Sequence, residues 1–426
     1  MIDIKLIREN PKLVKENIKK KFQIEKLALV DKILKSDREW RSLKVQTDKL
    51  RADRNKVSKE IAEAKKSKKD TRPLMKKAKE IPNKINKLEE KAKKLRDQIN
   101  QDLSNIPNII HKSVPIGKDE KANKEIRKWG KPLKPKFKLK NHVELIENLD
   151  LADFDASAKV SGNGFYYLKK DLALLNQALI SFAIDFMTKK GYEYIEAPLM
   201  LNQQALFASM DRNEIENSVY TIKDYDLGLI GTAEQSLLAL HSGQAIPFQN
   251  LPKKYFSYSI CFRKEIGSHG INEKGLWRTH QFNKVEQFIF CKPEDSEKLY
   301  DELLKNSEEI MKALKLPYRV VEFCSGDLSN WKHRSVDLEV YRPTTKSYGE
   351  IGSLSNCTDY QARKLNIKYI NKKNERIVLH TLNNTALATS RVMVAILENY
   401  QQKDGTIKVP TVLQKYMNGK KVIGKK

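Results

Sequence analysis

Apolar residues recur with a seven-residue period through much of the first hundred residues. Beyond Asp37 they form two lines, with Leu43, Leu50, Val57 and Ala64 on the first and Trp40 and Ile61 near the second. After the polar stretch KKSKKDTRP the period resumes as Ala78, Ile85, Ala92 and Ile99, interleaved with Ile81, Leu88 and Leu95. This spacing is typical of the seam between packed helices. It predicts two helices of roughly 28 residues, each about 42 Å long, in an antiparallel hairpin. Pro82 is expected to kink or locally break the second helix.

The predicted hairpin is strongly basic. Residues 1–100 contain 32 Lys or Arg and 16 Asp or Glu, so they hold +16 of the chain's net charge of +27. The polar link is itself basic, with Lys65, Lys66, Lys68, Lys69 and Arg72. A dimerisation coiled coil and an RNA-contacting arm both fit this pattern, and charge runs on helices are often only solvated faces. The positive charge favours the RNA-contacting arm.

A second, mixed region follows the helical period. The proline-containing segment SNIPNIIHKSVPIGKDEKANKEIRKWGKPLKPKF predicts a linker, with a domain boundary near residues 105–115. Beyond it, DLALLNQALISFAIDFMTKKG has helical periodicity. The β-rich runs are YEYIEAPLM, KYFSYSICFRKEI, VEQFIFC, YRVVEFC and VDLEVYRP. Their hairpin-like spacing predicts a largely antiparallel α+β core.

Composition narrows the class of protein. The chain has 426 residues and 40% hydrophobic content, enough for several domains and at least one large core. No apolar run approaches the roughly 20 residues of a membrane span, and Asp3 and Glu9 lie where a targeting peptide avoids acids. The four cysteines lack a CxxC pair, which gives no zinc signature and favours a reducing compartment. We therefore expect a cytoplasmic protein with no membrane partner.

The stretch CFRKEIGSHGINEKGLWRTHQFNKVEQFIF places unusual chemistry on two strand-like runs. The first run carries Arg263 and Glu265, and the second carries Arg278, Phe282 and Glu286. Period-two alternation predicts that Arg263 and Glu265 face the same way, as do Phe282 and Glu286. Guanidinium groups pair with phosphate, a ring stacks on a base, and carboxylates accept from amino groups. The set predicts a nucleotide site, with an ordinary charged surface hairpin as the alternative.

Three further polar groups accompany this stretch. LGLIGTAEQ places Thr232 and Glu234 in a predicted loop, YGEIGSLSNCTDYQ places Glu350 and Ser353 in a polar run, and TLNNTALATSRVMVAILENY places Asn383, Thr385 and Arg391 around the start of an apolar helix. A helix beginning near Thr389 or Ser390 would direct backbone N–H groups and Arg391 toward an anion. Each group is a weak signal by itself.

Taken together, these residues resemble the seryl-tRNA synthetases nearly end to end. FRKE through HQFNKVE resembles the second class II motif, ALATSRVMVAILEN the third, and the helix leading into EAPLM the first, with TAE and SNCTDYQ in the right order. The resemblance implies a class II antiparallel β-sheet core flanked by helices, with a long N-terminal α-helical hairpin. It also implies a tRNA-binding arm over residues 1–110 and a catalytic core over 111–426. The implied protein is a homodimer that activates serine with ATP and Mg²⁺ and then acylates the 3′ end of tRNA(Ser).

The resemblance also implies individual roles. Arg263 would hold the α-phosphate and the carboxylate of the intermediate, and Arg278 and Arg391 the outer phosphates. Phe282 would stack on adenine, with Glu265 beside the adenine amino group. Glu350 and Ser353 would contact the metal ion, the ribose or the phosphates. Glu286, Asn383 and Thr385 would read the serine hydroxyl, and Thr232 and Glu234 would anchor its amino group.

Several positions depart from the family pattern. They include Gly231 before TAE, Gly349 where Arg is usual, Gly352 and Leu354, Asn384 with Thr385, Thr389 with Ser390, and the stretch NWKHRSVDLE. Gly349 and NWKHRSVDLE leave open a slower enzyme, a shifted amino-acid preference or a changed role. The alternatives to a serine–tRNA ligase are a synthetase-like RNA-binding or regulatory protein and a ligase that loads serine onto a carrier protein. The convergent charged residues argue against the former, and the basic arm against the latter.

Overall fold

The computed structural model describes residues 1–133, 135–266 and 274–424. The loop predicted between the two charged runs falls largely on 267–273 and lies outside the described residues. The chain forms two compact units, Met1–Pro107 and Asn108–Lys426.

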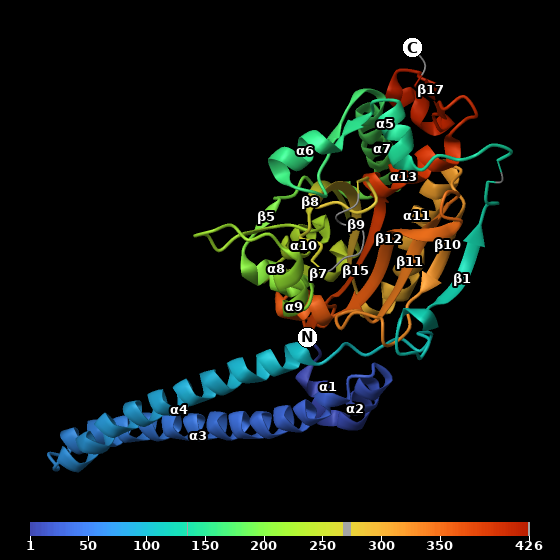
Figure 1. Cartoon of the computed structure of the whole chain (residues 1–426). Coiled ribbons are helices and arrows are strands. Elements are labelled where there is room, and N and C mark those ends of the chain that lie inside the picture. The colour runs from blue at the N-terminus through green and yellow to red at the C-terminus, as the bar shows by residue number, and fades with distance from the viewer. Residues whose placement is uncertain (134, 267–273, 425–426) are drawn as a thin grey trace. The chain divides into compact units, whose positions relative to one another are not determined.

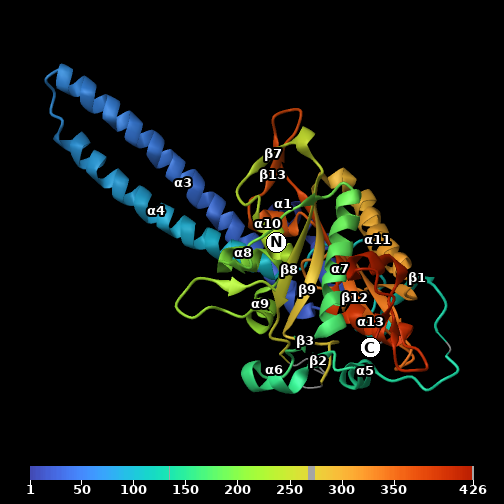
Figure 2. The same cartoon turned by 90° about the horizontal axis from the view of Figure 1, so that it is seen from above.

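The first unit is helical throughout. Its elements are α1 (Ile4–Glu9), α2 (Pro11–Lys20), a 3₁₀ turn (Ile24–Lys26), α3 (Leu27–Lys66) and α4 (Arg72–Asn105). Figures 1 and 2 show α3 and α4 side by side as a hairpin. Val57 of α3 packs with Ile81 and Ile85 of α4, which confirms the predicted seam. At 40 and 34 residues, both helices are longer than predicted, because α3 begins ten residues before Asp37.

Pro82 lies inside α4, which continues unbroken from Arg72 to Asn105. The predicted local break is therefore wrong. A proline in a helix interior costs about 3 kcal/mol, but its neighbours Ile81 and Ile85 are only 4% and 6% exposed. Burial of these two side chains against α3 holds the helix together across the proline.

The second unit is built on an eight-stranded sheet in the order β1-β10-β11-β12-β15-β9-β8-β4. The strands are β1 (Lys124–Trp129), β10 (Tyr318–Glu322), β11 (Arg334–Arg342), β12 (Ser347–Thr358), β15 (His380–Ala388), β9 (Gln281–Cys291), β8 (Lys253–Phe262) and β4 (Glu193–Tyr194). Every neighbouring pair is antiparallel except β4 with β8. The predicted α+β core with a largely antiparallel sheet is confirmed.

Helices and small sheets surround this sheet. The helices are α5 (His142–Asn148), α6 (Phe154–Ser161), α7 (Lys170–Lys189), α8 (Gln203–Ser209), α9 (Arg212–Ser218), α10 (Ala233–Ala239), α11 (Ser296–Ala313), α12 (Tyr360–Lys364) and α13 (Thr389–Tyr400). The small sheets are β14 (Arg376–Val378), β13 (Lys368–Ile370) and β7 (Ala245–Pro247); β2 (Ala152–Asp153) with β3 (Tyr167–Leu168); β5 (Met200–Leu201) with β6 (Gly228–Leu229); and β16 (Ile407–Lys408) with β17 (Val422–Ile423). Short 3₁₀ turns span Glu120–Ala122, Phe248–Asn250, Pro293–Asp295 and Thr411–Met417. Figure 2 shows α7 and α11 on one side of the sheet and α8 and α10 on the other.

The segment predicted to be a linker is partly built into the second unit. It contributes the edge strand β1, which pairs with β10. Upstream of β1, the backbone N–H of Asn108 donates to the carbonyl of Asn330, and that of His111 to the carbonyl of His333. The linker interpretation is wrong for these residues, because prolines flank β1 without interrupting it and leave its N–H groups free to pair.

Among the described residues, α7 is the one helix long and apolar enough, by length and composition alone, to cross a membrane. It is interrupted by Asp171 and Asp185, so it contains no continuous apolar run of the length of a membrane span. Half of the apolar window is buried inside the protein. Leu172, Leu175 and Leu179 belong to the main hydrophobic core, so α7 serves as a core helix.

Candidate functional site

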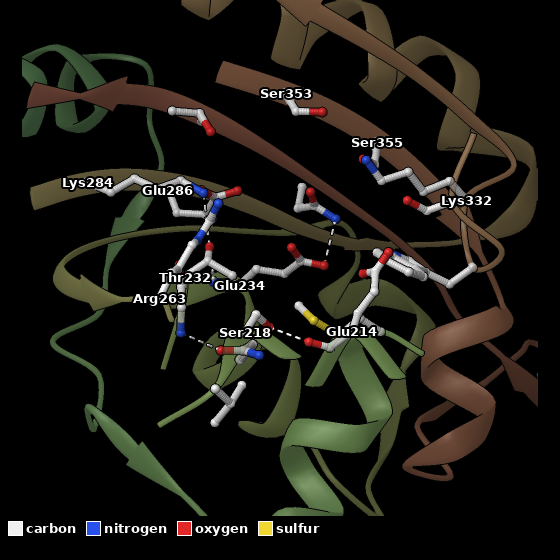
Figure 3. A pocket seen from close by; sticks show the side chains of 18 of the residues that line it. Glu214, Ser218, Thr232, Glu234, Arg263, Lys284, Glu286, Lys332, Ser353 and Ser355 are labelled. Carbon is white, nitrogen blue, oxygen red and sulfur yellow. Dashed lines mark hydrogen bonds and ion pairs between the residues drawn. The ribbon is translucent and has the colours of Figure 1, made fainter. Parts of the chain in front are cut away.

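Two adjoining cavities lie over one face of the large sheet, with volumes of about 490 and 220 Å³. They share Arg263, Glu265, Lys284, Glu350 and Thr385 in their walls. All twelve candidate residues line one or both cavities: Thr232, Glu234, Arg263, Glu265, Arg278, Phe282, Glu286, Glu350, Ser353, Asn383, Thr385 and Arg391. Figure 3 shows how the labelled side chains of the larger cavity converge.

Strand alternation explains why so many polar groups share this face. On β15, Asn383 and Thr385 face the cavities. Between them, Asn384 points the opposite way and donates to the carbonyl of Leu303 in α11 at 2.7 Å. Because side chains in a strand alternate between faces, β15 serves the cavity and the core at the same time.

The deep end of the larger cavity is rich in buried carboxylates. Thr232 caps α10, where its hydroxyl accepts from the backbone N–H of Glu234, so the predicted loop is a helix start. Glu234 accepts from the amides of Gln361 at 2.7 Å and Asn383 at 3.0 Å. Lys284 of β9 pairs with Glu286 and also donates to the Thr232 hydroxyl at 3.0 Å. These contacts fix six polar side chains around one small volume.

Burial changes the acidity of these carboxyl groups. Desolvation, reinforced by the charge of Glu286, raises the pKa of Glu234. Desolvation also raises the pKa of Glu286, although Lys284 and Arg263 oppose that shift. At the mouth of the cavity, desolvation and Asp211 raise the pKa of Glu214 to about 7. A cationic ligand group entering this end would favour the ionised carboxylates.

Three arginine side chains line the smaller cavity. Arg278 pairs with Glu265 at 2.5 Å, and Arg391 pairs with Glu350 at 3.0 Å. Arg263 donates from Nε to the carbonyl of Gly231 at 3.0 Å, and its guanidinium carbon lies 5.2 Å from the centre of the Phe282 ring. Each guanidinium is therefore held by a carboxylate or a carbonyl.

The predicted strand geometry around Arg263 is wrong. β8 ends at Phe262, and Glu265 has a φ of +49°, in the left-handed region. Arg263 and Glu265 therefore do not share a strand face by alternation. On β9, which is unbroken, Phe282 and Glu286 do occupy alternate positions as predicted. The predicted start of the apolar helix near Thr389 is confirmed by α13.

A second pair of carboxylates, Asp337 and Glu350, lines the larger cavity, and Glu350 also lines the smaller one. Asp337 of β11 is paired in register with Ser353 of β12. Desolvation and the charge of Glu350 raise the pKa of Asp337 well above its ordinary value. Desolvation acts in the same direction on Glu350, but Arg391 outweighs it, so the pKa of Glu350 is lowered. Asp337 Oδ1 is buried and has no hydrogen-bond partner among the described residues.

Several residues of the site were missed from the sequence. Lys284 could have been found, because it lies midway between Phe282 and Glu286 on the same strand face. Glu214 gave no comparable signal, and Lys332 and Asp337 lie in the stretch NWKHRSVDLE, which was noted only as a departure from the family pattern. Only the folded chain brings α9 and this stretch together at the cavity.

Two unusual glycines make room for neighbouring side chains. A Cβ at Gly349 would lie 2.4 Å from Cζ2 of Trp277, whose ring lies against the guanidinium groups of Arg342 and Arg391 at 4.3 and 5.5 Å. A Cβ at Gly352 would lie 2.8 Å from that of Thr385. Trp277 thus fills the space beside residue 349.

We expect Gly349→Ala to destabilise the protein by about 1–3 kcal/mol, because overpacking forces the tryptophan ring to move. Urea unfolding measures this cost. In a Trp277→Leu background the same substitution should cost less than about 1 kcal/mol, since the clashing ring is gone. Equal costs in both backgrounds would show that the close approach is unimportant.

Comparison with known proteins extends these observations. Residues 1–110 match the seryl-tRNA synthetase N-terminal domain, and residues 220–400 match the tRNA synthetase class II core domain (G, H, P, S and T). The serine–tRNA ligase of Methanocella arvoryzae is 44% identical over 421 residues, covering 98% of this chain and 99% of the relative.

Two solved structures agree over the whole chain. Seryl-tRNA synthetase from Pyrococcus horikoshii complexed with ATP has a TM-score of 0.92 and 42% identity, and 99% of each chain is covered. The cytoplasmic serine–tRNA ligase of Naegleria fowleri in complex with AMP has a TM-score of 0.88 and 33% identity, covering 99% of this chain and 98% of that one. The chain belongs to the seryl-tRNA synthetase family of aminoacyl-tRNA ligases.

Proposed function

We propose that the two adjoining cavities form one active site, in which serine and ATP give seryl-adenylate before the seryl group passes to the 3′ end of tRNA(Ser). The observation that carries this proposal is the convergence of twelve candidate side chains on these cavities. A regulatory protein without turnover would have no reason to keep this set of convergent charges.

The smaller cavity has the chemistry to hold ATP. Arg263, Arg278 and Arg391 supply three guanidinium groups for the phosphates. Phe282 offers a ring face for adenine, and Glu265 would accept from the adenine amino group. ATP phosphates would compete with Glu265 for Arg278 and with Glu350 for Arg391.

The deep end of the larger cavity suits serine. The buried carboxylate of Glu234 and the hydroxyl of Thr232 would hold the ammonium group, while Glu286, Asn383 and Thr385 would read the hydroxyl. Lys284 holds Glu286 in place through an ion pair. Arg263 belongs to both cavities and would hold the serine carboxylate beside the α-phosphate.

No covalent bond to the enzyme is needed for this reaction. The serine carboxylate would attack the α-phosphorus in line, pyrophosphate would leave, and catalysis would rest on positioning and charge neutralisation. The fixed guanidinium groups require little reorganisation as charge develops on the phosphates.

Three residues of the larger cavity, one of them shared with the smaller cavity, fit the Mg²⁺ implied by the family. Glu350, Ser353 and Asp337 offer oxygen ligands, which Mg²⁺ prefers. The unpartnered Oδ1 of Asp337 and the mutual repulsion of the two carboxylates are both relieved by a cation. When bound, Mg²⁺ would neutralise phosphate charge. Glu350 and Ser353 would be its main protein ligands, and Asp337 would be a third.

The basic hairpin suits tRNA. Lys65, Lys66, Lys68, Lys69 and Arg72 are all exposed at its tip. Exposed cations along a helical pair match the spaced phosphates of RNA and would release counterions on binding. We further propose a homodimer in the cytoplasm, as the family resemblance implies.

Serine-dependent exchange between ATP and pyrophosphate tests the proposal on the purified full-length chain. Exchange that requires serine and Mg²⁺ is the expected result. Binding of serine tRNA without any exchange would instead favour the regulatory alternative.

The site should prefer serine to both alanine and threonine. Alanine leaves Glu286, Asn383 and Thr385 without the ligand hydroxyl, and such sites discriminate by about 10⁴ or more. Threonine must be rejected by lack of space, which is the weaker discrimination, so it should be the stronger competitor. Exchange rates with the three amino acids measure this order. Faster exchange with alanine than with serine would show that Glu286 has another role.

A further inference from the structure

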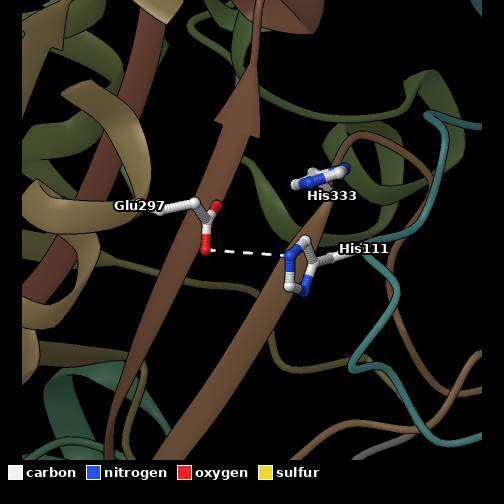
Figure 4. A group of neighbouring side chains, drawn as sticks. All are labelled: His111, Glu297 and His333. Carbon is white, nitrogen blue, oxygen red and sulfur yellow. Dashed lines mark ion pairs between the residues drawn. The ribbon is translucent and has the colours of Figure 1, made fainter. Parts of the chain in front are cut away.

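His111, Glu297 and His333 form a cluster of metal-binding side chains separate from the two cavities. Their potential ligand atoms all lie within 4.8 Å of one another. His111 Nε2 is 4.0 Å from Glu297 Oε2, and the centres of the two imidazole rings are 5.3 Å apart (Figure 4). The three residues come from the segment before β1, the first turn of α11 and the position just before β11.

One nitrogen of each imidazole ring has a hydrogen-bond partner, which orients the ring and leaves its other nitrogen for a ligand. His333 Nδ1 lies 2.6 Å from the carbonyl oxygen of Ile109, which leaves Nε2 of that ring for a ligand. His111 Nδ1 lies 2.9 Å from the Ser113 hydroxyl, which itself donates to Glu322 at 2.8 Å, and the backbone N–H of Ser113 also donates toward Nδ1 at 3.2 Å. Metal-binding histidines commonly have such a partner on the second ring nitrogen.

A hydrogen bond also orients the carboxylate of Glu297. Its Oε1 accepts from the amide of Asn356 at 2.9 Å, which leaves Oε2 toward His111. Arg334 lies 3.4 Å from Oε2 and 2.8 Å from Glu322. The carboxylates of Glu297 and Glu322 and the guanidinium of Arg334 together carry one net negative charge beside the two imidazoles. This charge favours binding of a dication.

We propose that His111, Glu297 and His333 bind one divalent transition-metal ion, with water in the remaining position. Two imidazoles and one carboxylate are a ligand set suited to Zn²⁺, unlike the all-oxygen set at the active site. Ligands of tetrahedral zinc at about 2.0–2.1 Å lie roughly 3.3 Å apart. The cluster would therefore contract by about an ångström on binding. The bound ion would tie the segment before β1 to α11 and β11.

A metal ion bound to this cluster would also affect one wall of the larger cavity. Trp331 and Lys332, which precede His333, line the larger cavity. A metal bound to His333 would fix this wall without touching serine or ATP. The metal site rests on the geometry of the cluster and does not depend on the proposed catalytic roles.

Isothermal titration of the full-length, metal-stripped protein with Zn²⁺ tests the proposal. Excess Mg²⁺ is kept in the buffer to occupy the oxygen-ligand site. We expect one Zn²⁺ per chain, with affinity reduced at least about tenfold in His111→Ala and in His333→Ala. The matched control is His241→Gln, a partly buried histidine outside the cluster, which should bind as the wild type does. Co²⁺ should give visible d–d absorption that is lost in His111→Ala.

If His333→Ala does not fold, His111→Ala and Glu297→Gln decide the question. Wild-type affinity in both would overturn the proposal, as would an absence of saturable Zn²⁺ binding to the unmodified chain. Serine-dependent exchange, measured in parallel, distinguishes loss of the metal site from failure of the proposed function.

Discussion

Replacing Arg263 with alanine is expected to abolish serine-dependent pyrophosphate exchange while leaving the protein folded, and Arg391→Ala should do the same. Each guanidinium would make charge-assisted contacts with phosphate, worth about 1.5–3 kcal/mol or more, which corresponds to roughly 10–150-fold in rate. Arg263 should be the more damaging, since it lines both cavities whereas Arg391 lines one. Exchange kinetics at saturating ATP and serine measure the loss.

Arg376→Ala is the matched control, because Arg376 is exposed on the small strand β14. It should exchange pyrophosphate at the wild-type rate. Circular dichroism and urea unfolding separate a damaged site from a damaged fold. Near-normal exchange in Arg263→Ala or Arg391→Ala would contradict the proposed active site.

Shortening the hairpin should leave exchange intact but reduce aminoacylation of serine tRNA by about 100-fold, or roughly 2.7 kcal/mol. The structure suggests where to cut. Arg51 of α3 pairs with Glu89 of α4 at 2.6 Å, so these residues lie opposite each other. A short glycine-containing link between them would replace residues 52–88 and remove the basic tip, while keeping the buried seam residues Leu43 and Ala92.

The control for the shortened protein is exchange itself, which needs no tRNA. Binding of serine tRNA to the intact chain should weaken steeply with salt, and the shortened chain should show a smaller salt dependence. If the shortened protein charged tRNA at the full rate, the hairpin would be structural and the dimerisation interpretation would be favoured.

The helical hairpin was the most predictable part of the fold. Its seam follows a period that local sequence encodes directly, so Val57, Ile81 and Ile85 could be assigned to it from spacing alone. Its ends could not, because α3 begins in a stretch without the clear heptad pattern. Pro82 shows a related failure: local backbone preference indicated a break, and tertiary packing prevented it.

Strands that serve the site were harder to recognise. The residues of β12 were interpreted as a polar run, because its cavity-facing positions carry Ser353 and Ser355. Those of β15 were interpreted as the start of a helix, because its cavity-facing positions carry Asn383 and Thr385. Polar residues on the cavity face remove the apolar alternation that identifies a strand. The candidate residues were found from the charged and polar stretches, and the family resemblance implied their roles. The place of Lys332 and Asp337 in the cavity depends on long-range pairing that spacing does not encode.

The contact between Trp277 and Gly349 makes these two positions interdependent. With any side chain at position 349, the tryptophan ring could not occupy its present place, because the first carbon would already lie 2.4 Å from it. An arginine introduced at 349 alone would displace the ring from its contacts with Arg342 and Arg391. A larger residue at 349 therefore requires a smaller residue at 277 in the same variant.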